Sequence, residues 1–164
     1  MITEKIEKIL NEQIEKEGYS SNLYLSMASW AETEGFAGIS TWFYAQAGEE
    51  LLHMMKFIHF INERGGHAII PAFDQPPVNF DGIKKVFDQV LEHERFISGS
   101  INDIAALAIK ENDFATQNWI QWFITEQVEE ESSVQGIIDK LNLLGEENMY
   151  LFDRDIMSLR GTGE

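Results

Sequence analysis

The sequence predicts an all-α protein, a bundle of four long helices with one long crossover connection and a short fifth helix at the C-terminal end. Three observations support this fold class. Apolar residues recur at spacings of three and four through four long segments. All three prolines fall within residues 65–80, so the long segments contain no helix-breaking proline. The remaining connections between long segments are only a few residues long.

The first two helices form the first hairpin. We expect the first helix over residues 3–34, with Thr3 as its N-cap. A turn that contains Gly35 and Gly38 is expected to follow it. The next is expected over residues 39–64, where a pair of glycines ends it. A turn this short makes the two helices antiparallel neighbours.

The second hairpin follows the same logic. A helix is expected over residues 82–111, and another over 114–144 with Asp113 as its N-cap and Gly145 after its end. A short fifth helix is expected over residues 146–159.

The connection over residues 65–80 sets the topology. Its sixteen residues can span roughly 50 Å when extended, and a helix of ~26 residues is about 40 Å long. The segment can therefore run the length of the bundle and join parallel neighbours. One compact domain is expected for 164 residues.

Each long helix carries a carboxylate within its apolar stripe. The stripe of the second helix contains Glu50 and His53, one turn apart, and that of the fourth contains Gln127 and Glu130. Glu17 and Glu94 hold the corresponding positions in the first and third helices. All four carboxylates are expected to be buried at a similar depth in the bundle.

Four facing carboxylates require compensation, because burying even one unpaired carboxylate costs several kcal/mol. No Lys or Arg lies on these stripes, so the acids either take up protons or bind cations. A pair of divalent metals fits the ligand count, and oxygen ligands with an imidazole suit iron, manganese or zinc. Two alternatives stay open: a helical interaction protein without metal, and a di-metal redox protein that stores nothing.

A second acidic group follows the fourth stripe. Glu126, Glu129 and Glu130 place like charges three and four residues apart, and Glu49 lies about 100° around the second helix from Glu50. This group is either a solvated acidic face or an extra cation site that shares Glu130.

Composition excludes several classes of function. A net charge of −16 argues against nucleic acid or anionic membrane as a partner and favours cations. Without cysteine, disulfides, thiolate chemistry and iron–sulfur clusters are excluded. No apolar run reaches the ~20 residues that cross a bilayer, and no apolar signal segment begins the chain, so a cytoplasmic protein is expected.

These residues resemble those of the bacterial non-haem ferritins, and the resemblance covers essentially the whole chain. It rests on the proline-bearing crossover and on the stretches "EKEGYSSNLYLSM", "AGEELLHMMKF", "EHERF" and "WFITEQVEEE". The resemblance implies a ferritin-like bundle and a homo-oligomeric cage of 24 chains. It further implies a ferroxidase that oxidises Fe(II) with dioxygen or hydrogen peroxide and stores ferric mineral in the cavity.

The resemblance also implies roles for individual residues. Glu17 and His53 would hold one iron, Glu50 would bridge two irons, and Glu94 and Glu130 would hold the second.

The remaining roles lie around this centre. Gln127 would hydrogen-bond bound water or dioxygen, and Glu49, Glu126 and Glu129 would form a third, more labile iron site. Tyr24 would hydrogen-bond a ligand and supply an electron.

Haem is not expected. Bacterioferritins, which use haem, carry a second Glu-x-x-His on the fourth helix and a Met directly after the second-helix glutamate. Here the fourth helix has Gln127-x-x-Glu130, and Leu51 follows Glu50.

Overall fold

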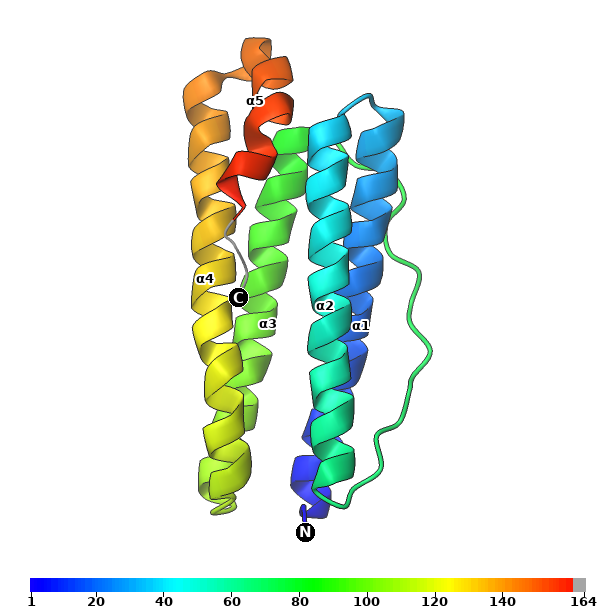
Figure 1. The fold of residues 1–164 in the computed structure, drawn as a ribbon, viewed down its shortest axis with the longest axis vertical. Helices are drawn as coiled ribbons and strands as arrows, with labels where there is room; N and C mark the ends of the chain where they lie inside the picture. The colour runs from blue at the N-terminus through cyan, green and yellow to red at the C-terminus, as the bar shows by residue number, and fades with distance from the viewer. Residues whose placement is uncertain (161–164) are drawn as a thin grey trace.

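The computed structural model describes residues 1–160, and of Glu146 only the backbone. Within these residues the chain is all-α, as predicted, with four long helices in a bundle and a short α5 at one end (Figure 1). The long helices are α1 (Glu4–Thr33), α2 (Ala37–Glu63), α3 (Ile83–Lys110) and α4 (Phe114–Leu144). None of the described helices has the length and apolar character that a membrane crossing requires.

Two hairpins make up the bundle, with α1 against α2 and α3 against α4. The crossover between α2 and α3 runs along the bundle from one end to the other beside α1 (Figure 1). It therefore makes α2 and α3 parallel, as its length predicts. Phe73 of the crossover packs on Gly18 of α1, where an added Cβ would lie 2.3 Å from the Phe73 ring.

Both predicted N-caps are present. The hydroxyl of Thr3 accepts a hydrogen bond from the Ile6 amide at 3.4 Å. The carboxylate of Asp113 accepts from the Thr116 amide at 3.1 Å and also pairs with the guanidinium of Arg64 at 3.1 Å. This pair joins the end of α2 to the start of α4.

The start of α2 differs from the prediction. The helix begins at Ala37 rather than at residue 39, so Gly38 lies inside the helix and not in the turn. A side chain from α5 explains the difference, because the Asp153 carboxylate accepts a hydrogen bond from the Ile39 amide at 2.8 Å. A Cβ on Gly38 would lie 1.8 Å from the Asp153 carbonyl oxygen, so only glycine admits α5 here.

The C-terminal segment is also less regular than one helix over 146–159. It contains a 3₁₀ turn (Glu146–Asn148), α5 (Met149–Asp155) and a second 3₁₀ turn (Ile156–Leu159). The tighter turns let a short segment bend back onto the bundle. Phe152 and Ile156 are thereby buried in the core.

The core consists of two apolar clusters along the bundle. One includes Phe43 and Phe87 and lies toward α5, and the other includes Phe57 and Phe123 and lies toward the opposite end. Along every long helix, the buried carboxylate falls between the residues of the two clusters. A polar layer therefore crosses the middle of an otherwise apolar interior.

Candidate metal centre

Each long helix contributes one carboxylate to the polar layer, as the stripes predict. The exposed fractions are 1% for Glu17, 2% for Glu50, 1% for Glu94 and 7% for Glu130. The prediction that all four are buried is confirmed. His53, which lies one turn after Glu50, is 5% exposed.

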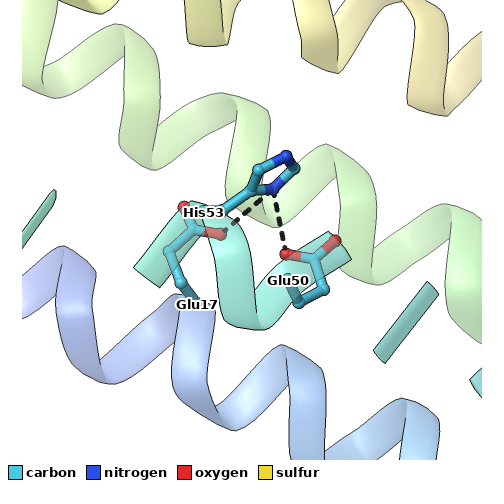
Figure 2. Close-up of side chains that lie close together, drawn as sticks. All are labelled: Glu17, Glu50 and His53. Carbon is cyan, nitrogen blue, oxygen red and sulfur yellow. Dashed lines mark ion pairs between the residues drawn. The ribbon is translucent and has the colours of Figure 1, made fainter. Parts of the chain in front are cut away.

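Glu17, Glu50 and His53 lie together in this layer (Figure 2). One ligand atom from each lies within 4.8 Å of the others. The Nδ1 atom of His53 is 3.4 Å from a Glu50 oxygen and 3.9 Å from a Glu17 oxygen. Two carboxylates and an imidazole at this spacing form a candidate ligand set for a cation such as Fe(II), Mn(II) or Zn(II).

Hydrogen bonding leaves part of this group unsatisfied. Gln13 Nε2 donates to Glu17 Oε1 at 2.8 Å. Glu17 Oε2 and Gln13 Oε1 are buried and have no hydrogen-bond donor among the described residues. Buried acceptors of this kind cost about 1–3 kcal/mol each. A cation bound at Glu17 would remove the cost for its unpartnered oxygen.

The other two carboxylates are held by different partners. The Tyr24 hydroxyl donates to one oxygen of Glu94, and Gln127 Nε2 donates to the other at 3.1 Å. Gln46 Nε2 donates to Glu130 Oε2 at 3.0 Å. Glu94 and Glu130 do not join the three-residue group within 4.8 Å. Their part in a metal centre stays a prediction.

Burial and mutual repulsion dominate the electrostatics of the layer. Burial raises the pKa of Glu17 and of Glu50 well above the ordinary value, and the charge of the neighbouring carboxylates raises it further. The pKa of Glu130 rises to about 8, first from burial and then from the charge of Glu94. Burial also raises the pKa of Glu94, although hydrogen bonds from Tyr24 and Gln127 oppose the shift.

The residues expected at a third iron site are more scattered. Glu126 is half-buried and Glu129 is exposed on α4. Glu49 is half-buried on α2 and forms an ion pair with Arg160. The structure does not bring these three residues into the group of Glu17, Glu50 and His53. The third site stays a prediction.

Sequence reasoning overlooked three residues that touch the candidate ligands. Gln13 holds Glu17, Gln46 holds Glu130, and Arg160 holds Glu49. The two glutamines had a detectable signal, because each lies one helical turn before a buried glutamate of its own helix. Arg160 had none, because its partners are more than a hundred positions away in the chain.

Comparison with known proteins agrees with this architecture. A family model described as a ferritin-like domain matches residues 7–144. A bacterial non-haem ferritin from Campylobacter jejuni is 40% identical over 161 residues, which cover 97% of this chain and 96% of the relative. A probable bacterial non-haem ferritin-like protein from Haemophilus influenzae is 38% identical, with 97% and 98% covered.

Solved structures are similar over the same length. The open-pore ferritin of the hyperthermophilic archaeon Archaeoglobus fulgidus superposes with a TM-score of 0.93 at 42% identity, covering 98% of each chain. A humanized archaeal ferritin superposes with a TM-score of 0.95 at 40% identity over all of both chains.

Proposed function

The chain belongs to the ferritin-like family, and from this premise we propose that it is an iron-storage protein with ferroxidase activity. One observation supports this most strongly: Glu17, Glu50 and His53 meet in the interior, and one buried oxygen of Glu17 has no donor within the described part of the chain. A helical interaction protein would have no use for such a group. Two Fe(II) ions are the substrate at this centre.

The ligand roles follow the resemblance residue by residue. Glu17 and His53 bind the first iron, Glu50 bridges, and Glu94 and Glu130 bind the second within the same subunit. The contacts of Gln127 suit its role, because its amide already donates to Glu94. Tyr24 donates to the other oxygen of Glu94, and this contact supports a role for its phenol at the proposed second iron.

Oxidation requires two electrons from the pair of irons. Each Fe(II) gives one electron to dioxygen, which takes up two protons and leaves as hydrogen peroxide. The protein supplies fixed ligands and a dry site. The rings of Trp122 and Phe123 stand edge-on to His53, with ring centroids 5.6 and 5.7 Å away. They shield the centre from bulk water on that side.

Storage requires a cavity that a single chain does not enclose. We propose that 24 copies assemble into a cage and that ferric ions hydrolyse and mineralise inside it. The acidic residues Glu49, Glu126 and Glu129 would pass iron between the centre and the cavity. Haem has no part in this proposal.

The decisive variant is Glu50→Ala. Removing the bridging carboxylate should abolish fast Fe(II) oxidation, because the second iron loses its shared ligand. Stopped-flow absorbance after mixing with aerobic Fe(II) measures the rate, and anaerobic calorimetry counts the Fe(II) ions bound per chain. Two to three ions are expected for the unaltered protein and fewer for the variant.

Glu63→Ala is the matched control. It removes an exposed glutamate from the same helix and should oxidise Fe(II) as fast as the unaltered protein. Circular dichroism and light scattering should show intact helices and assembly for both variants. Normal oxidation by Glu50→Ala would refute the bridging role, and a complete lack of Fe(II) binding by the unaltered protein would refute the function.

A further inference from the structure

Arg160, the last described residue, reaches back across the bundle to α2. Its guanidinium contacts three groups there: the Trp42 carbonyl oxygen at 3.4 Å, Gln46 Oε1 at 2.9 Å and Glu49 Oε1 at 2.5 Å. These partners are four and three residues apart, so they lie along one face of the helix. The Arg160 side chain is 16% exposed. Three contacts and this burial make a built binding site for the guanidinium.

The same contacts connect Arg160 to the metal centre. Gln46 accepts from Arg160 through its oxygen and donates through its nitrogen to Glu130 Oε2 at 3.0 Å. The two contacts favour the same orientation of the Gln46 amide, with its oxygen toward Arg160 and its nitrogen toward Glu130. Glu49 is the other partner, and it follows Gln46 by three residues on the face of α2 that Arg160 covers.

We propose that Arg160 is an internal counter-cation that competes with metal ions for Glu49. The proposal rests on the proposed function, in which Glu49 belongs to the third, labile iron site. A carboxylate oxygen that receives a guanidinium at 2.5 Å is not free to bind an ion, and the fixed positive charge repels a divalent cation beside it. Iron that binds Glu49 must therefore either displace Arg160 from Oε1 or bind beside its positive charge, and both keep iron binding weak and iron release easy.

Zn(II) calorimetry on the metal-free assembled protein tests the competition without redox chemistry. Arg160→Gln removes the charge and should bind the third ion more tightly, on the order of tenfold, the scale of ordinary coupling between competing ligands. The first two ions should bind as in the unaltered protein. Arg160→Lys keeps the charge and should leave the third affinity nearly unaltered, which separates a charge effect from a packing effect.

Two further variants complete the design. Arg154→Gln removes the same charge from the same C-terminal segment, where Arg154 pairs with its exposed neighbour Asp155, and should leave the affinity for the third ion unaltered. In a Glu49→Gln background the third ion should bind weakly, and adding Arg160→Gln should give no further gain.

The outcomes separate the two proposals. Tighter third-ion binding in Arg160→Gln alone supports the inference. If Arg160→Gln binds the first two ions normally but binds the third with unaltered or lower affinity, or not at all, the inference is overturned and the proposed function stands. Failure of the unaltered protein to bind even the first two ions overturns both.

Discussion

The carboxyl group of Glu130 illustrates how a buried acid is tuned by its surroundings. It is 7% exposed, accepts one hydrogen bond from Gln46, and faces the charges of Glu94 and Glu49. Burial and repulsion outweigh that hydrogen bond and raise its pKa to about 8. At neutral pH the metal-free protein therefore keeps a proton on a group that, in the proposed function, loses it when iron binds.

This shift predicts how stability depends on pH. Between the ordinary glutamate pKa of 4.5 and about 8, the folded state holds a proton that the unfolded chain has released. The contribution of Glu130 to the free energy of unfolding is therefore greatest below pH 4.5. It falls by roughly several kcal/mol as the pH rises toward 8. Guanidinium unfolding of the metal-free protein at pH 5, 6, 7 and 8 measures the slope.

Glu130→Gln is the control for this slope. A glutamine cannot ionise, so the variant should lose less stability over this pH range than the unaltered protein. Saturating Zn(II) should remove the slope in the unaltered protein by replacing the proton. Parallel pH profiles for the two proteins would contradict the assigned origin.

Helix α2 depends on a contact that lies outside its own sequence. Its N-cap residue, Phe36, makes no side-chain capping bond, and Asp153 of α5 supplies the missing acceptor at the Ile39 amide. Gly38 permits this approach. The helix that carries Glu50 and His53 is thus anchored at one end by α5 and at the other by the Arg64–Asp113 pair.

Gly38→Ala should therefore displace α5 and destabilise the protein. The new Cβ would lie 1.8 Å from a backbone carbonyl oxygen, and such overpacking costs about 1–3 kcal/mol. Gly99→Ala, in α3, meets nothing within 4 Å and should be neutral or stabilise by about 0.5–1 kcal/mol through helix propensity. Thermal unfolding compares the two, and equal midpoints would show that α5 does not pack as described.

The outer face of α2 concerns the assembled protein. Tyr44, Leu51, Leu52 and Met55 recur on one side of the helix and are 45%, 48%, 62% and 37% exposed. An apolar row of this kind on a chain with a charge of −16 is typical of a protein–protein contact. Burying it between copies of the chain fits the proposed cage.

Leu52→Glu should therefore impair assembly, because each contact would bury an unpaired carboxylate. Light scattering should show a mass well below that of a 24-subunit cage, with helical content retained. Val128→Glu, an equally apolar exposed position on α4 (67% exposed), should assemble normally. A full-sized particle from Leu52→Glu would remove this face from the assembly.

Much of the fold was predictable because its signals are local. Periodicity and prolines placed the four long helices within a few residues of their observed bounds, and the length of the crossover implied its direction. The glutamates within the apolar stripes were predicted to be buried because those stripes face the core. The predicted start of α2 was wrong because its capping acceptor comes from Asp153, which is distant in the sequence. The C-terminal segment was predicted as one helix, whereas the structure divides it into 3₁₀ turns and α5 that pack on the bundle.

The candidate site divides along the same line. The repeating apolar pattern of each helix was enough to identify Glu17, Glu50, His53, Glu94 and Glu130. A polar residue that interrupts an apolar stripe can be recognised from the sequence of a single helix. Which of them meet, and which partner holds each, depends on distances between helices. Gln46 against Glu130 and Arg160 against Glu49 join residues 84 and 111 positions apart. Packing alone brings such pairs together, because helical periodicity carries no information about the neighbouring helix.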